Sequence, residues 1–383
     1  MDFNHLPFDS SLHEYQAQAA ALFKGWKAGD AGAIHIVKTK HPKFLDERVP
    51  WLPKKLPDSE IRAVTLELAD AELVLARWYD FHDWLALAKY AESVAQKTSA
   101  AYRFEAAVES VISGDLDALQ AALAAHPDLA HARSERITHF DPPAHRATLL
   151  HYVAANGTEG YRQKCPANAV AVAETLLQAN AEVDALADLY GGRCTTMSLL
   201  VSSCHPAAAG LQVPLVDKLL DWGAAIEGRG SGHWVSPLMT ALVFGYLDAA
   251  HALVRRGARV DSLSAAAGLG RTDRARELLA GASGEDRHRA LVFASQHGHV
   301  EMVRLLLDAG EDPNRYNPKG THSHCTPLHQ AAAAGHEAVV RLLVEKGAKL
   351  DIKDTIFEGT PLGWAEHGGR TEVADYLRQS GAA

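Results

Sequence analysis

Two histidines separated by a single residue form the clearest metal-binding pattern in this sequence. They are His322 and His324, in the segment RYNPKGTHSHCTPLH. On an extended backbone, residues two apart point the same way, so both imidazoles would reach one divalent metal ion. The other ligands would come from nearby segments, which offer Glu285, Asp286, His288, Asp354 and Glu358. The alternative is that both histidines are ordinary surface residues, because this pattern alone is a weak signal.

A second group of side chains has the composition that acid–base catalysis needs. Its members come from the polar segments ITHFDPPAHRA, DLYGGRCTT and RGSGHWVS, and they are His139, Asp141, Asp188, Tyr190 and His233. Together they would supply a base with a pKa near neutrality, an orienting carboxylate and a phenol that stabilises an oxyanion. The reaction would be of the hydrolase, lyase or isomerase type. The same residues also suit structural turns, because proline, glycine and Asp are all typical turn formers.

Aromatic and cationic residues in the same kind of segment favour binding over catalysis. The candidates for binding are Arg229, Trp234, Tyr316 and Phe357. Side chains of these types commonly supply most of the binding energy in protein interfaces. We therefore expect them to contact a partner.

All these segments lie between copies of one repeated unit, shown best by residues 326–348, TPLHQAAAAGHEAVVRLLVEKGA. The unit has a short alanine-rich helix, a Gly-His break, and a second apolar helix that ends at Gly347. Such a helix pair cannot bury its own apolar face and needs a copy on each side. The unit resembles the ankyrin repeat. This resemblance implies an all-α, ankyrin-repeat solenoid of about eight helix-turn-helix repeats, whose β-hairpin-like loops, or fingers, carry the polar segments.

Repeat lengths vary along the predicted ankyrin-repeat domain, residues 101–383. The first three repeats carry long insertions, whereas the two repeats that follow Asp261 have almost no finger, and residues 283–288 are expected to be only a stub. Histidines at the repeat's own positions should have structural roles, since buried polar groups usually satisfy backbone groups. These histidines are His151, His205, His299, His329 and His336.

Residues 1–100 lack the repeat and are expected to form an N-terminal helical cap. Apolar residues at helical spacing predict helices near residues 11–28, 34–40, 66–78 and 83–96. The proline-rich stretch 47–59 is predicted to be an exposed loop. The phrases LADAELVLARWYDFHDWLAL and DTIFEGTPLGWAEHGGRTEVADYL resemble a group of bacterial ankyrin proteins with a helical leader. That resemblance implies a docking role for the cap.

Composition argues against several classes of partner. The formal net charge is −9, and no basic run is long enough to neutralise a nucleic-acid backbone. Four cysteines without CxxC spacing indicate free thiols in a reducing cytoplasm. No stretch is long and apolar enough for a membrane span. We therefore expect a cytoplasmic protein with no nucleic-acid or membrane partner.

Two functions are compatible with these observations. In the first, the chain is a binding module that recognises a cytosolic protein through its fingers and concave groove. In the second, the fingers enclose a polar small molecule and catalyse acid–base chemistry, with a divalent metal on His322 and His324.

Overall fold

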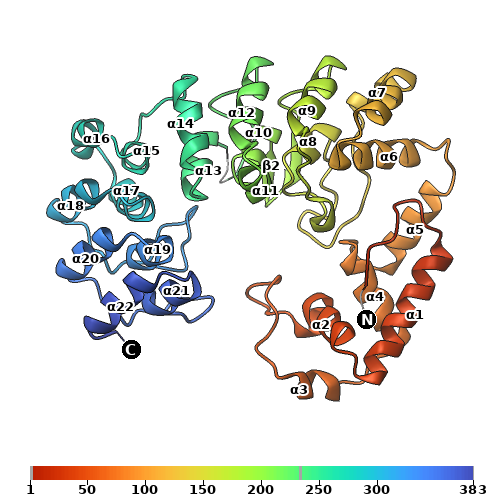
Figure 1. Cartoon of the computed structure of the whole chain (residues 1–383), viewed down its shortest axis with the longest axis horizontal. Helices are drawn as coiled ribbons and strands as arrows, with labels where there is room; N and C mark the ends of the chain where they lie inside the picture. Colours follow the sequence, from red (N-terminus) through yellow and green to blue (C-terminus); the bar gives the residue numbers. More distant parts are fainter. Residues whose placement is uncertain (1–2, 233–234, 383) are drawn as a thin grey trace. The chain divides into compact units, whose positions relative to one another are not determined.

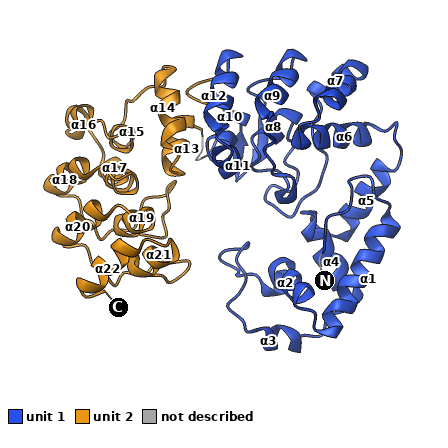
Figure 2. Cartoon of the chain, viewed as in Figure 1, with its two compact units in different colours: residues 1–224, 229–232 blue, residues 225–228, 233–383 orange. Residues whose placement is uncertain are grey.

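A computed structural model describes residues 3–232 and 235–382 of the chain (Figure 1). The chain divides into two compact units (Figure 2). Unit 1 comprises residues 1–224 and 229–232, and unit 2 comprises residues 225–228 and 233–383. None of the described helices is both long and apolar enough to cross a membrane.

Unit 1 begins with the four helices expected for the N-terminal cap and with two short helices that were not expected. The expected helices are α1 (Leu12–Ala28), α2 (Ala31–Lys40), α4 (Leu68–Trp78) and α5 (Trp84–Val94), and the two short ones are η1 (Pro42–Phe44) and α3 (Asp58–Ala63). Ser11 caps α1 and exchanges hydrogen bonds with Glu14, and Gly29 ends the helix in the left-handed conformation that glycine adopts without strain. These helices share one apolar core that includes Leu22, Ile61 and Val74. The proline-rich loop is exposed at Trp51, as predicted.

The rest of unit 1 consists of helix pairs. The elements are α6 (Ala100–Ser113), α7 (Leu116–Ala125), η2 (Pro127–Ala130), α8 (Leu149–Val153), η3 (Gly160–Arg162), α9 (Ala169–Gln178), β1 (Ala187–Leu189), β2 (Gly192–Cys194), α10 (Thr196–Leu200), α11 (Cys204–Ala208) and α12 (Gln212–Asp221). The first helices of successive pairs pack on one another, as do the second helices. Strands β1 and β2 form an antiparallel hairpin, which is the shape expected of a finger. The predicted boundary near residue 100 falls inside unit 1, where α5 packs against α6.

Unit 2 continues the same arrangement. Its helices are α13 (Pro237–Val243), α14 (Leu247–Arg255), α15 (Leu263–Gly268), α16 (Thr272–Leu279), α17 (Gly284–Gln296), α18 (Val300–Asp308), α19 (Pro327–Ala334), α20 (Glu337–Glu345), α21 (Pro361–His367) and α22 (Thr371–Gln379). Helices α15, α17, α19 and α21 form one row, and α18, α20 and α22 form the other (Figure 1). A continuous apolar core lies between the rows and includes Leu291, Leu328 and Leu343. The expected solenoid of stacked helix pairs is confirmed.

One expectation about the fingers is wrong. Residues 283–288, predicted to be a stub, contain the start of α17, which begins at Gly284. The Ser283 side chain caps this helix by accepting a hydrogen bond from the Asp286 N–H (3.1 Å). The Asp286 carboxylate in turn accepts the N–H groups of Leu263 and Ser264 at the start of α15. The polar residues therefore serve as helix caps, which explains why they looked like a loop in the sequence.

Candidate functional site

Unit 2 presents a row of aromatic and imidazole rings drawn from three separate repeats. We call it the aromatic row, and it consists of Phe244, His322, His324, Phe357 and Trp364. Neighbouring ring centroids are 5.6 to 6.4 Å apart, which is within the range of favourable ring contacts. Phe244 is 39% exposed and Phe357 is 49% exposed. The rings of the row therefore pack on one another, and the two phenylalanines also expose apolar surface to solvent.

The loop before α19 is folded tightly by its own hydrogen bonds, and this fold positions the two histidines of the row. The expected extended backbone is wrong, because the Ser323 N–H donates to the Thr321 carbonyl (2.8 Å) and the Cys325 N–H to the His322 carbonyl (3.3 Å). The two imidazole planes are consequently perpendicular, at 90°. His322 Nε2 donates to the Val243 carbonyl (3.2 Å).

This geometry bears on the predicted metal pair, His322 and His324. Among the described residues, no group of three or more His, Cys, Asp or Glu side chains is arranged to hold a metal ion. Of the ligands suggested by the sequence, His288 is fully buried on α17 and donates from Nε2 to the Tyr316 carbonyl (3.1 Å). Burial lowers the pKa of both His322 and His324, so both rings are neutral at pH 7. Metal binding by the pair stays a prediction.

Asp354 holds the loop that presents Phe357. Its carboxylate accepts hydrogen bonds from the N–H groups of Ile356 (2.9 Å), Phe357 (2.6 Å) and Gly359 (2.8 Å), and from Trp364 Nε1 (3.0 Å). Burial alone would raise the pKa of Asp354, but these hydrogen bonds outweigh it and lower the pKa. The carboxylate is therefore ionised at neutral pH and fixes two members of the aromatic row.

We expect Asp354→Ala to reduce the free energy of unfolding of unit 2 by about 2 kcal/mol, because several buried donors lose a charged acceptor. Urea denaturation followed by circular dichroism measures the change. A matched control is Asp351→Ala, which removes an exposed carboxylate three residues earlier. Equal midpoints for the two variants would show that Asp354 does not hold the loop.

Tyr316, predicted to bind a partner, lies on the finger that precedes α19. Its ring is 43% exposed, and its hydroxyl donates to the Lys353 carbonyl on the next finger (2.6 Å). This bond fixes the ring while leaving much of its face accessible. A side chain fixed in this way loses little conformational entropy on binding.

In unit 1, the predicted acid–base residues have separate partners. His139 Nε2 lies 3.3 Å from the Asp80 carboxylate, whereas Asp141 is exposed. Asp188 lies 3.8 Å from Arg193 across the β1–β2 hairpin. The contacts recorded for the described members are thus with residues outside the predicted set. The acid–base role of His139 stays a prediction, with Asp80 as the carboxylate that contacts it.

Two of the remaining predicted residues, Tyr190 and Arg229, lie in finger segments of unit 1. The Tyr190 hydroxyl donates to Asn156 Oδ1 (2.7 Å), and the ring is 56% exposed. Arg229 Nε lies 3.4 Å from the Asp184 carboxylate, and the arginine side chain is 69% exposed. His233 and Trp234 lie outside the described residues. Tyr190 and Arg229 are thus accessible side chains with polar contacts to Asn156 and Asp184 respectively.

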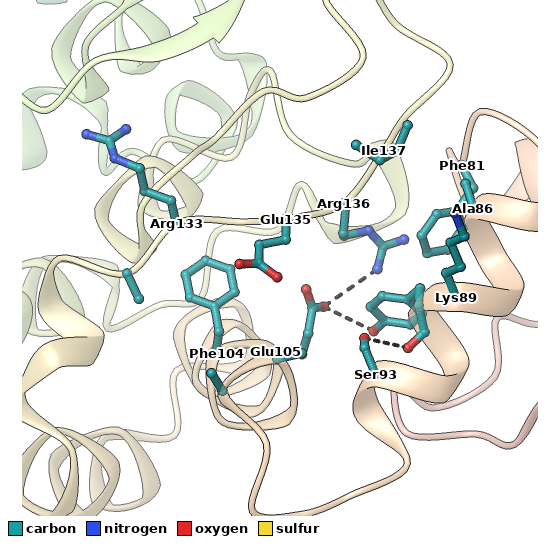
Figure 3. Close-up of a pocket in the computed structure, with 14 residues that line it drawn as sticks. Phe81, Ala86, Lys89, Ser93, Phe104, Glu105, Arg133, Glu135, Arg136 and Ile137 are labelled. Carbon is teal, nitrogen blue, oxygen red and sulfur yellow. Dashed lines mark hydrogen bonds and ion pairs between the residues drawn. The ribbon is translucent and has the colours of Figure 1, made fainter.

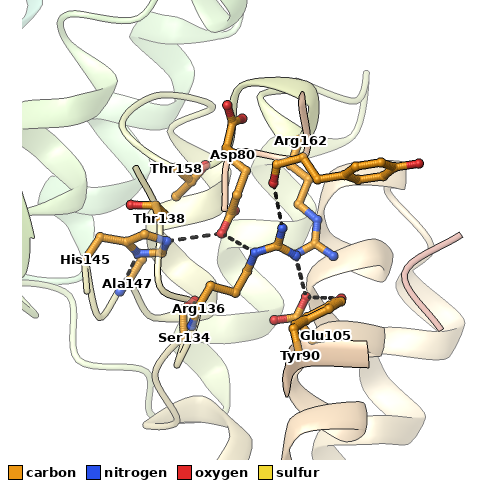
Figure 4. Close-up of polar contacts among 12 residues, drawn as sticks. Asp80, Tyr90, Glu105, Ser134, Arg136, Thr138, His145, Ala147, Thr158 and Arg162 are labelled. Atoms are coloured by element: carbon orange, nitrogen blue, oxygen red, sulfur yellow. Dashed lines mark hydrogen bonds and ion pairs between the residues drawn. The ribbon is translucent and has the colours of Figure 1, made fainter. Parts of the chain in front are cut away.

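A cluster of buried charges links the cap to the first repeats, and no local pattern in the sequence indicates it. The Glu105 carboxylate accepts hydrogen bonds from Arg162 Nη1 (2.6 Å) and the Tyr90 hydroxyl (3.1 Å) (Figure 4). Arg136 Nε lies 3.0 Å from Glu159 Oε1. All four charged residues are at least 97% buried, with exposures of 3% for Glu105, 3% for Arg136, 0% for Glu159 and 1% for Arg162.

Arg136 occupies the centre of this cluster. Its guanidinium carbon lies 4.0 Å from the ring centre of Phe81 and 4.6 Å from that of Tyr90, and Nη2 donates to the Tyr79 carbonyl (3.0 Å). Glu159 also accepts from His145 Nε2 (3.1 Å). Burial opposes ionisation of Glu159, but the charge of Arg136 and the His145 contact lower its pKa. The network is therefore charged, with two arginines balancing two carboxylates.

The cluster borders a cavity of 420 Å³ between α5, α6 and residues 132–137 (Figure 3). Its walls are largely apolar and include Phe81, Phe104 and Ile137. Glu105 and Arg136 line it as well, and both are already paired. A volume of this size suits a small molecule or the side chains of a bound peptide.

The histidines at the positions of the repeat have the expected structural roles where the structure records their contacts. In both His151 and His329, Nδ1 accepts from the backbone N–H of the threonine that caps the helix. Nε2 of these rings donates to a carbonyl of the next repeat, that of Cys194 or Gly359. His299 and His336 donate to the carbonyls of Gly268 and Gln296 in the preceding repeat. His205 is exposed.

Comparisons with known proteins agree with this architecture. A family model described as ankyrin repeats (3 copies) matches residues 263–354 and 317–383. The chain is 33% identical over 125 residues to cyclin-dependent kinase 4 inhibitor B of Homo sapiens, an alignment that covers 25% of this chain and 90% of that protein.

Larger proteins share the same repeats. The chain is 37% identical over 98 residues to ankyrin repeat and SAM domain-containing protein 6 of Mus musculus, which covers 26% of this chain and 11% of that protein. It is 33% identical over 219 residues to ankyrin repeat and KH domain-containing protein mask-1 of Caenorhabditis elegans, which covers 55% of this chain and 8% of that protein. The chain thus spans only about a tenth of the length of these two relatives.

Proposed function

Because the chain belongs to the ankyrin-repeat family, we propose that it is a protein-binding module whose unit 2 contacts a partner protein through the aromatic row and Tyr316. The observation that carries this proposal is the row itself, in which rings from three repeats contact one another and two of them, Phe244 and Phe357, are exposed. Exposed and preorganised aromatic side chains are the usual anchors of protein interfaces.

The relatives support the same interpretation. By its printed name, the human relative inhibits a kinase, so a protein made almost entirely of matching sequence acts on another protein. We extend only the class of activity, protein binding, to this chain. We also propose the cytoplasmic location and the bacterial origin that the sequence predicts. The four cysteines are free thiols, as a reducing compartment requires.

The local chemistry of the row indicates the kind of surface that would bind. His322 and His324 are neutral at pH 7 because burial lowers the pKa of both. Phe244 and Phe357 add apolar area. A partner segment that inserts aliphatic or aromatic side chains matches such a surface better than a highly charged one.

We expect the double substitution Tyr316→Ala/Phe357→Ala to weaken partner binding at least about 30-fold, the size of effect typical of anchor residues. Affinity capture followed by mass spectrometry identifies the partner, and titration calorimetry with the purified partner measures the affinity. Trp51→Ala is the matched control, since it removes an aromatic ring that is 76% exposed on unit 1. If the double variant and the control bind the same partner equally well, the aromatic row is not the interface.

A further inference from the structure

The first finger of unit 1, residues 132–147, forms one wall of the apolar cavity of 420 Å³, whose other walls belong to α5 and α6 (Figure 3). In its first arm, residues 133–138, the side chains alternate. Ser134, Arg136 and Thr138 are buried, whereas Glu135 and Ile137 between them are exposed. This alternation is that of a β-strand with one buried face. The arm therefore has two edges at which its backbone can pair.

One edge of the arm pairs with the second arm of the same finger. The Ser134 N–H donates to the Ala147 carbonyl (2.8 Å), and the Thr138 N–H donates to the Pro143 carbonyl (2.8 Å). Both pairs fit one antiparallel register, since moving along the first arm moves the partner back by the same number of residues. In such a strand, the backbone groups of successive residues point to opposite edges. Those of the odd-numbered residues therefore point away from the second arm, toward the cap.

The cap pairs with only part of this second edge. The His82 N–H donates to the Ile137 carbonyl (3.0 Å), and the His139 N–H donates to the Asp80 carbonyl (3.3 Å). The pairing ends where α5 begins at Trp84, because a helix uses its backbone groups for its own hydrogen bonds. Beyond that point, the edge of the arm faces the cavity.

Three backbone groups at this edge are left without a partner. The N–H groups of Glu135 and Ile137 and the carbonyl of Glu135 make no hydrogen bond to any described residue. Unpaired groups at a strand edge are a template for another extended chain, which pairs through its own backbone. A purely apolar small molecule would leave these groups unpaired. The edge therefore favours a peptide as the occupant of the cavity.

The walls of the cavity favour a large apolar side chain in that peptide. Phe81, Phe104 and Ile137 provide apolar surface, and the small side chains of Ala86 and Ala101 leave the space between them open (Figure 3). Alternate side chains of an extended peptide point to the same face, so a residue paired with the edge places its side chain between these walls. Such a cavity suits an aliphatic or aromatic group.

The charges around the cavity favour an acidic residue in the same peptide. Lys89 and Glu135 line the cavity, and neither forms an ion pair with another described residue. The guanidinium of Arg133 donates to two backbone carbonyls and has no carboxylate partner among the described residues. Arg136 and Glu105 belong to the cluster whose charges balance. The lining thus presents two unpaired cations and one unpaired carboxylate, which complements a segment with negative charge.

We propose that the cavity and the free edge at residues 135–137 bind an extended segment of a partner protein. The segment pairs with the backbone of Glu135 and Ile137, places a large apolar side chain in the cavity and carries an acidic residue near Lys89. Main-chain pairing supplies affinity, and the cavity supplies specificity. This site lies in unit 1 and shares no residue with the aromatic row of unit 2, so the two sites can be tested separately.

The test is a selection from a display library of random short peptides, with the full chain carrying Tyr316→Ala/Phe357→Ala as the bait. These substitutions disable the aromatic row, so the selection reports on other sites. Fluorescence anisotropy then measures the affinity of an enriched peptide for further variants of this bait. Thermal denaturation followed by circular dichroism verifies that each variant is folded.

Two substitutions remove the two parts of the site, and each has a matched control. Glu135→Pro removes one N–H group of the edge, whereas Glu135→Gln keeps that group and removes only the charge. Ala86→Phe fills the cavity from α5. Ala95→Phe adds the same ring at an exposed position at the end of the same helix, outside the cavity.

We expect the enriched peptides to share a large apolar residue and an acidic residue. Glu135→Pro and Ala86→Phe should each weaken binding at least about tenfold, the loss typical of an anchoring contact. Glu135→Gln and Ala95→Phe should bind at least as tightly as the bait, since neither change removes an attractive contact.

The proposal is overturned if no peptide is enriched or if the enriched peptides are basic. It is also overturned if either substitution, Glu135→Pro or Ala86→Phe, binds the peptide as tightly as its control. A cavity that binds only an apolar dye, or that joins two copies of the chain in a dimer sensitive to Ala86→Phe, would hold a different occupant and would equally overturn it.

Discussion

Acidification from about pH 7.5 to about pH 5 is expected to remove roughly 2 kcal/mol of unfolding free energy from each unit. The largest contributions come from His151 in unit 1 and His297 in unit 2, whose pKa values burial lowers to about 4. In the unfolded chain, a histidine has a pKa of about 6.5. On acidification, the unfolded state therefore takes up the proton first. The stabilisation is complete above about pH 6.5 and is lost progressively as the pH falls toward 4.

The contacts of the two rings explain why they resist protonation. His151 Nδ1 already accepts from the Thr148 N–H (3.1 Å), and Nε2 donates to the Cys194 carbonyl (3.3 Å). A second proton on His151 Nδ1 would point at the Thr148 N–H, which is itself a donor, and the buried ring has no water to solvate the charge. His297 is 9% exposed, and its Nε2 donates to the Leu242 carbonyl (2.9 Å). Charging either ring would cost desolvation energy, and no carboxylate of the described residues is among the groups that act on either ring.

Urea denaturation at the two pH values, at constant ionic strength, measures the predicted loss. His297→Gln keeps a donor for the Leu242 carbonyl but cannot titrate, so it should reduce the pH dependence of unit 2 by roughly 2 kcal/mol and leave that of unit 1 unchanged. His13→Gln, a substitution of an exposed histidine, should change neither. A wild-type protein that is equally stable at both pH values would show that these rings are protonated without penalty.

Arg136→Met is expected to destabilise unit 1 by about 3 to 5 kcal/mol. The substitution removes the cation that lies 3.0 Å from Glu159 and 3.6 Å from Glu105, and both carboxylates remain buried. It also removes the donor to the Tyr79 carbonyl, which joins the cap to the segment after η2. An uncompensated buried carboxylate is among the most destabilising features a protein can have.

The same denaturation experiment tests this prediction, with Arg193→Met as the matched control. Arg193 is 58% exposed and lies 3.8 Å from Asp188, so its loss should cost less than about 1 kcal/mol. Adding Glu159→Gln to Arg136→Met should recover part of the loss, because it neutralises one of the stranded carboxylates. An Arg136→Met variant as stable as the control would mean that the cluster does not contribute to the stability of unit 1.

Local signals in the sequence predicted most of the helices. The cap helices were expected near residues 11–28 and 83–96, and they form at Leu12–Ala28 and Trp84–Val94. Ser11 and Asp83 cap them, as their types allow. The prediction of a stub at residues 283–288, where α17 begins, was wrong because its residues resemble those of a loop. The first turn of α17 contains Gly284 and three charged residues, which resemble a loop until the cap at Ser283 is seen.

The candidate site was less predictable than the fold, because its residues meet through long-range contacts. His139 was paired with nearby Asp141 in the sequence, but its contact is Asp80 in the cap. His322 was expected to point with His324, but it donates to the Val243 carbonyl, which lies 79 residues earlier. The backbone turns around Ser323 and is not extended as the sequence predicted.

The sequence by itself determined the all-α repeat architecture, the exposed finger positions of Tyr316 and Phe357, and the structural histidines such as His151 and His329. Each of these depends on residues within one or two turns of helix, where caps and apolar periodicity act directly. Only the tertiary structure decided the aromatic row, the buried cluster of Glu105 and Arg162, and the cavity that borders this cluster. These features join residues far apart in the chain, 57 positions in the case of Arg162 and Glu105. The physical reason is that solenoid stacking, which brings distant loops and helices together, leaves no periodic pattern at the individual residues it joins.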